Sequence, residues 1–90
     1  MRSYLAVKNL TTHPAITVCG VDDVIFSDIP KGTYAGFKAV EPGSVRLEIF
    51  DNFMKRITVL WVPIESNMRA AVTVRDEFVE FTPMPACEGC

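Results

Sequence analysis

Hydrophobic and polar residues alternate along most of this chain in short segments. Between Ser44 and Phe50, three aliphatic residues alternate with Arg46 and Glu48. A period of two places the aliphatic side chains on one face of a β-strand and the charged ones on the other. Six prolines and five glycines interrupt the chain and leave no amphipathic stretch of helical length. The pattern predicts seven strands, at residues 4–10, 15–19, 24–26, 34–40, 44–50, 56–62 and 69–75, and an eighth at 78–82.

Turn residues separate these segments at Gly20–Asp23, Ile29–Gly32 and Pro42–Gly43. Seven or eight short strands with such spacing are typical of a single antiparallel β-sandwich, Ig-like or transthyretin-like, with a small barrel as the alternative. Ninety residues make one domain at most. We therefore assign residues 1–83 to an all-β sandwich domain and residues 84–90 to a C-terminal tail that contains cysteines.

The segment 56–62 and the residues after it depart from simple alternation, because apolar side chains occupy both faces. A sandwich strand with one solvated face should not be apolar on both sides. The second face is therefore expected to lie under the tail or to meet another subunit. We predict an association surface, and a homo-oligomer or another protein partner, on the five apolar residues of this region: Phe53, Met54, Leu60, Val62 and Ile64.

Composition and charge exclude several classes of protein. Hydrophobic residues make up 49% of the chain and charged residues 22%, which excludes a disordered linker. A net charge of −2 gives no basic field for nucleic acid or for an anionic membrane. The longest apolar run, Val59–Ile64, is far shorter than the ~20 residues of a membrane span. The first residues contain no apolar core of a signal peptide, so a cytoplasmic location is expected.

A connected pattern of apolar, proline and glycine residues runs through the first half of the chain. It comprises Val24-Ile25-Phe26, the run Asp28–Tyr34, Phe37, Val40, Pro42-Gly43, Leu47 and Ile49. This pattern resembles a bacterial family of small β-sandwich domains from cell-surface and envelope proteins, known as domain of unknown function 4397. The resemblance implies a short single-domain member with a cell-envelope or spore-coat association. It also implies architectural roles, Gly43 in a turn and Tyr34 and Phe37 in the core, and it brings no catalytic residue.

The C-terminal tail contains the sharpest local motif, Cys87-Glu88-Gly89-Cys90. Two cysteines at this spacing suit a metal half-site or a redox pair. Structural zinc needs four ligands, and the rest of the chain adds only Cys19 and His13. Three interpretations stay open: a zinc site completed by a second subunit, a redox-active pair, and incidental thiols. Because a single C-x-x-C supplies at most half of a zinc site, we expect no resident cofactor.

Exposed aromatic residues would support a different function, the binding of a small ligand or carbohydrate. Phe37 and Trp61 are the main candidates, and Phe53 is a third if it is exposed. The chain has no G-x-S-x-G elbow and no glycine-rich phosphate loop, and its single histidine, His13, has no partner implied by the sequence. The sequence favours a non-enzymatic interaction or structural module, with ligand binding or a metal or redox role as alternatives.

Overall fold

The computed structural model describes residues 3–21 and 23–84, and the regular elements within these residues are all β-strands. Every predicted strand is present, which confirms the all-β prediction. The strands are β1 (Ser3–Leu10), β2 (Ala15–Cys19), β3 (Val24–Pro30), β4 (Tyr34–Val40), β5 (Gly43–Phe50), β6 (Arg56–Ile64), β7 (Arg69–Arg75) and β8 (Val79–Met84). Within the described ranges there is no helix that is long and apolar enough to cross a membrane.

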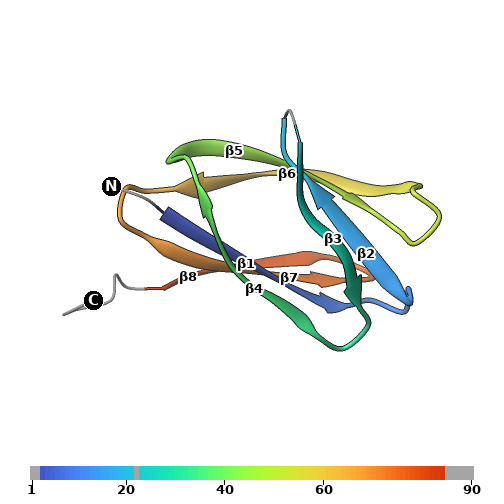
Figure 1. Cartoon of the computed structure of the whole chain (residues 1–90). Coiled ribbons are helices and arrows are strands. Elements are labelled where there is room, and N and C mark those ends of the chain that lie inside the picture. Colours follow the sequence, from blue (N-terminus) through green and yellow to red (C-terminus); the bar gives the residue numbers. More distant parts are fainter. Residues whose placement is uncertain (1–2, 22, 85–90) are drawn as a thin grey trace.

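The strands form two four-stranded sheets that pack face to face as a β-sandwich (Figure 1). Sheet A has the order β4-β1-β7-β8, and sheet B has the order β3-β2-β5-β6. Neighbouring strands are antiparallel except β1 and β7, which run parallel from the pair Tyr4–Arg69 to the pair Leu10–Arg75. The described strands therefore confirm the sandwich over the small barrel.

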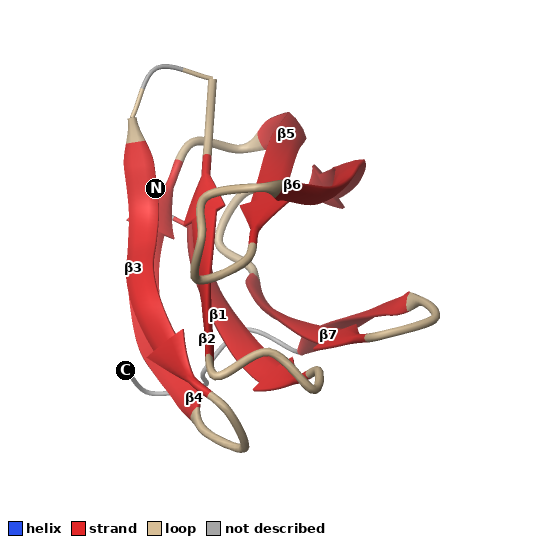
Figure 2. Cartoon of the chain, turned by 90° about the vertical axis from the view of Figure 1, so that its right-hand side faces the viewer, coloured by secondary structure: helices blue, strands red, loops and turns tan. Residues whose placement is uncertain are grey.

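The two sides of the sandwich differ. On one side β3, an edge of sheet B, lies beside β4, an edge of sheet A (Figures 1 and 2). On the other side, Figure 2 shows β6 and β7 well apart in opposite layers. Lys38 of β4 strengthens the first side, because its Nζ donates a 2.5 Å hydrogen bond to the carbonyl of Ile25 in β3 and lies 5.2 Å from the centre of the Phe26 ring.

β3 is longer than predicted, because it continues through the expected turn at Ile29 to Pro30. Asp28 has a φ of 52° and forms a bulge. Between the pairs Ile16–Ile29 and Val18–Phe26, β3 therefore uses one more residue than β2. The backbone N–H of Asp28 donates to Oγ1 of Thr17 on the neighbouring strand. The bulge absorbs the extra residue and pairing then resumes, and Pro30 is accepted because β3 is an edge strand.

The core lies between the two sheets, and β6 contributes to it through Val62 and Ile64, which are only 2% and 3% exposed. The predicted association surface is therefore wrong for these two residues. Val62 pairs with Val45 and Leu60 with Leu47, so these side chains face inward with the rest of β5's apolar face. The fully buried apolar cluster consists of Leu5, Val7, Ile16, Val18, Phe26, Ile29, Leu47, Ile49, Val62, Ile64, Ala70, Val72 and Val74.

Asn9 is a polar side chain that is completely buried at the end of β1. Its Nδ2 donates to the carbonyl of Ile29 in β3 at 2.9 Å, which joins sheet A to sheet B. Its Oδ1 accepts hydrogen bonds from the N–H of Thr11 at 3.0 Å and from the Thr11 hydroxyl at 2.6 Å. Because a buried amide is stabilising only when its partners are in place, this network fixes the β1–β2 connection against β3.

We predict that Asn9→Ala lowers the free energy of unfolding by about 1–3 kcal/mol, because it leaves buried partners of Ile29 and Thr11 without a hydrogen bond. Urea unfolding followed by circular dichroism measures the change. Asn52→Ala, at an exposed turn position, is the matched control and should change stability little. Equal midpoints for Asn9→Ala and the wild type would contradict the role of Asn9.

Candidate functional site

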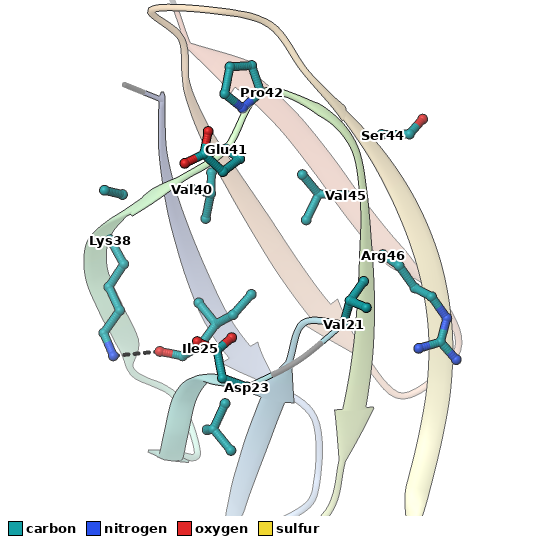
Figure 3. Close-up of a pocket in the computed structure, with 12 residues that line it drawn as sticks. Val21, Asp23, Ile25, Lys38, Val40, Glu41, Pro42, Ser44, Val45 and Arg46 are labelled. Atoms are coloured by element: carbon teal, nitrogen blue, oxygen red, sulfur yellow. Dashed lines mark hydrogen bonds between the residues drawn. The ribbon is translucent and has the colours of Figure 1, made fainter. Parts of the chain in front are cut away.

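A pocket of about 540 Å³ opens at one end of the sandwich, between the β2–β3 turn, the end of β4 and the start of β5 (Figure 3). Ile25, Val40 and Val45 supply an apolar wall, and Asp23 and Glu41 add carboxylates. The apolar side chains face the space between the strands in Figure 3. The pocket is thus an opening into the end of the core with two acidic residues among its lining side chains.

The two cations beside this pocket already have partners within the protein. The Lys38 ammonium bonds to the carbonyl of Ile25, as the dashed line in Figure 3 marks. Nη1 of Arg46 lies 2.6 Å from Oε1 of Glu48, with which it forms an ion pair on β5. Both cations are therefore engaged within the protein, since Lys38 joins β4 to β3 and Arg46 is paired along β5.

A second hollow, of about 250 Å³, lies on the outer face of sheet A. Two small residues that pair across β1 and β7, Ala6 and Ala71, form its floor. Tyr34 and Phe37 of β4 form an aromatic wall, and Lys8 and Thr73 add polar groups: the hollow is lined by Ala6, Val7, Lys8, Tyr34, Phe37, Ala71 and Thr73. We call it the aromatic groove.

A bulge in β4 creates the aromatic groove. Between the pairs Leu5–Lys38 and Val7–Ala35, β4 uses three steps where β1 uses two, so that Gly36 and Phe37 both oppose Ala6. Phe37 is consequently 40% exposed and Tyr34 is exposed as well. The core positions that the family resemblance implied for Tyr34 and Phe37 are therefore wrong. Phe37 instead faces a cation, since Cζ of Arg69 lies 5.7 Å from its ring centre.

The two aromatic residues predicted for ligand binding are not brought together. Phe37 lies on the outer face of sheet A, whereas Trp61 lies on β6 of sheet B, where it is 62% exposed and pairs with Arg46. Phe53, in the β5–β6 turn, is still more exposed. The structure adds Tyr34 beside Phe37, a neighbour that the sequence pattern did not reveal because the bulge in β4 decides which side chains share the outer face.

The free edge of β6 is the third candidate site. β6 is the last strand of sheet B, and among the described residues no strand pairs with its outer edge. Pro63 lacks an N–H group and lies opposite Ser44 of β5. Proline is accepted in a sheet where its nitrogen points away from the neighbouring strand. Backbone groups alternate in direction along a strand, so residues two positions apart point to the same edge. Val59 and Trp61 therefore direct their N–H and C=O groups to the free edge, as Pro63 directs its C=O group.

The other edges of the two sheets carry features that block pairing with a further strand. Charged side chains, prolines and bulges are the usual means of such protection. β6 has a bulge at Ile57 and a proline at residue 63, but no charged residue between these two positions. The three other edge strands carry a charge inside the strand together with a bulge or a proline: Asp28 and Pro30 in β3, Lys38 with the bulge in β4, and Glu80 and Pro83 in β8. In β6 the one charge, Arg56, is at the first position of the strand, before the bulge.

The β5–β6 turn holds two apolar residues of the predicted association surface in solvent beside the start of β6. The carboxylate of Asp51 is buried and accepts hydrogen bonds from the N–H groups of Phe53 and Lys55, both at 2.9 Å. The N–H of Lys55 is the main cause that holds the pKa of Asp51 below its ordinary value, with a smaller effect from Phe53. Asp51 therefore shapes the turn that exposes Phe53 and Met54.

The cysteines give weaker evidence for a functional site than the pockets and the β6 edge do. Cys19 is half-buried in β2, and burial, followed by the negative charges of Glu48 and Asp23, raises the pKa of its thiol. A raised pKa disfavours the thiolate, which is the reactive form. Within residues 3–21 and 23–84 no three histidine, cysteine or acidic side chains are grouped as a metal site. The predicted half-site, Cys87 and Cys90, lies outside the described residues.

Comparison with known proteins supports the fold. No family model matches the chain, and no curated protein matches it. The C-terminal domain of AlgF from P. aeruginosa is a similar solved structure, with a TM-score of 0.55, 16% sequence identity, and coverage of 92% of this chain and 98% of that domain. At this identity the likeness shows a common sandwich architecture, and the resemblance to domain of unknown function 4397 stays a prediction.

We predict that Asp51→Asn lowers the free energy of unfolding at neutral pH, because an amide accepts the two backbone hydrogen bonds more weakly than a carboxylate. The pKa of Asp51 is lower in the folded protein, so its stabilisation is complete above the ordinary carboxyl pKa near ~4 and is lost as the pH falls through the folded value. Urea unfolding at several pH values should show the difference between wild type and variant shrinking in acid. A difference in unfolding free energy between wild type and Asp51→Asn that does not change with pH would contradict this prediction. Glu41→Gln, which makes the same change at an exposed residue, is the control.

Proposed function

We propose that this chain is a non-enzymatic β-sandwich module that acts by association, and that the free edge of β6 is its binding surface. One observation carries the proposal: between the bulge at Ile57 and Pro63, this edge has no charged side chain, and no described residue pairs with its outward backbone groups. The three other edge strands carry a charge inside the strand, whereas the one charge of β6, Arg56, is at its first position and outside this segment. An edge of this kind is a template for another extended segment.

Strand addition would use both the backbone and the side chains of β6. The outward N–H and C=O groups of Val59 and Trp61 can form antiparallel hydrogen bonds with an extended partner. Trp61, exposed on the outer face, adds a large apolar contact of the kind that dominates many interfaces. On the inner face, Leu60 is only half-buried and gains cover from a partner strand.

Binding of a small ligand is a second candidate function, which the aromatic groove favours. Tyr34 and Phe37 line the groove together with the small residues Ala6 and Ala71. Aromatic rings offer a flat apolar face to the C–H groups of a sugar ring, and the hydroxyl of Thr73 and the ammonium of Lys8 lie in the same lining. The groove therefore suits a carbohydrate better than the end pocket, whose cations are already paired.

The edge proposal predicts that a strand-forming peptide protects two backbone amides of β6. Addition of the capped peptide acetyl-TVTVTV-amide should slow hydrogen exchange at the N–H groups of Val59 and Trp61, as measured by NMR, because these groups become hydrogen-bonded. A peptide with proline at alternate positions is the control. Trp61→Lys should weaken binding by about tenfold or more, while Ser44→Lys, on the neighbouring strand, should not. Unchanged exchange at millimolar peptide would contradict the proposal.

The groove proposal predicts saturable binding of a neutral gluco-oligosaccharide, measured by calorimetry. Phe37→Ala should weaken this binding by roughly two- to tenfold, since one aromatic contact is removed. Phe53→Ala removes an equally large ring from the β5–β6 turn and serves as the matched control. Equal affinities for the wild type and Phe37→Ala, or no binding at all, would refute a carbohydrate site in the groove.

A further inference from the structure

We infer that the partner at the free edge of β6 is a second copy of this chain, joined by antiparallel pairing of the two β6 strands about a twofold axis at Leu60. The inference rests on the proposed function, because it names the occupant of the same edge. It follows from the symmetry of the β6 sequence about Leu60, from the side chains that this symmetry would bring together, and from the charges at the two ends of the strand.

The usable part of the edge is symmetric about Leu60. The bulge at Ile57 precedes Leu60 by three residues, and Pro63 follows it by three. An antiparallel copy centred on Leu60 places Val59 opposite Trp61 of the partner subunit, and the same pair recurs on the other side of the axis. Since both residues direct their N–H and C=O groups to the free edge, each pair can exchange two hydrogen bonds.

The same register brings complementary side chains together on both faces. On the inner face, the half-buried Leu60 meets Leu60 of the partner subunit, at the mouth of a hollow between β6 and the β7–β8 turn. On the outer face, exposed Trp61 lies beside the partner's Val59, an aromatic and a β-branched residue whose cross-strand contact is favourable. No charged side chain lies between Ile57 and Ile64, so like charges do not oppose each other within the paired segment.

Charge complementarity selects this register over its neighbours. Lys55 and Glu65, both exposed, lie one residue beyond the two ends of β6 and each five residues from Leu60. A twofold axis at Leu60 therefore brings Lys55 close to Glu65 of the partner subunit, once at each end. An axis at Val59 would place Lys55 opposite the partner's Pro63, and an axis at Trp61 would place it opposite the partner's Asn67. Only the Leu60 axis among these three pairs opposite charges.

The pairing would join the two copies of sheet B into one continuous eight-stranded sheet, since each contributes four strands. Such a contact is isologous, because each copy uses the same strand, and it closes after two subunits. The β3 edges that remain at the outer ends carry Asp28 with its bulge and Pro30, so they stop further addition. The structure therefore assigns a closed dimer rather than a filament.

Sedimentation equilibrium of the full chain, in low salt with a reducing agent, tests this inference. The wild type should dimerise reversibly at micromolar to high-micromolar concentration. Lys55→Glu or Glu65→Lys should weaken the dimer by roughly two- to tenfold, and the double exchange Lys55→Glu with Glu65→Lys should restore it, because the charges then pair again in reverse. Lys31→Glu makes the same charge change at an exposed turn far from β6 and should have no effect.

Each contrary result has its own meaning. A monomer at high-micromolar concentration, with rapid hydrogen exchange at the N–H groups of Val59 and Trp61, would overturn self-pairing. The proposed edge site would still stand in that case if acetyl-TVTVTV-amide protects these two amides. It would fall if the peptide does not protect them. A monomer whose two amides are protected at every concentration would show that a segment of its own chain occupies the edge, and would also overturn the inference. A dimer that the double exchange does not restore would refute the Leu60 axis.

Discussion

The constraint on which this structure depends is that two open sheets have four edges, and each edge exposes backbone groups that can pair with another chain. A chain of ninety residues has few strands with which to cover them. At three edges a charge inside the strand is combined with a bulge or a proline. The same features shape the surface, because the bulge in β4 turns Phe37 outward and Lys38 ties β4 to β3. β6 is different, because its protection is confined to its two ends.

The side of the sandwich that carries β3 and β4 is held by polar contacts between the sheets. The Asn9 amide and the Lys38 ammonium both donate to carbonyls of β3, one from each of the two neighbouring strands β1 and β4. The side that carries β6 depends more on apolar contact, with Leu60 and Ile57 packed against the core while remaining partly exposed. Incomplete burial and a free backbone edge thus coincide on one strand, which is why association is expected there.

The strands and the sandwich could be predicted from the sequence because alternation reports which side chains share a face, and turn residues mark where each strand ends. The arrangement of strands could not, because β1 pairs with β7 through contacts between residues far apart in the chain. For the same reason alternation separated the two faces of β6 correctly but assigned Val62 and Ile64 to the outside. The face that points to the core is decided by the pairing of Val62 with Val45, which no local pattern reveals. The exposure of Tyr34 and Phe37 likewise depends on a bulge opposite Ala6.

An edge whose central segment is uncharged and apolar on both faces is an aggregation hazard unless its pairing closes. Two unprotected edges on one sheet would allow copies to add without limit, whereas one unprotected edge allows a single isologous contact. Within the described residues sheet B has one such edge, since Asp28, its bulge and Pro30 protect β3. A charge within Thr58–Val62 would protect the monomer and would also prevent the pairing. The placement of Lys55 and Glu65 just outside the strand leaves the hydrogen-bonding segment neutral and makes its two ends complementary, which is the distribution of charge that a closed pair of β6 strands requires.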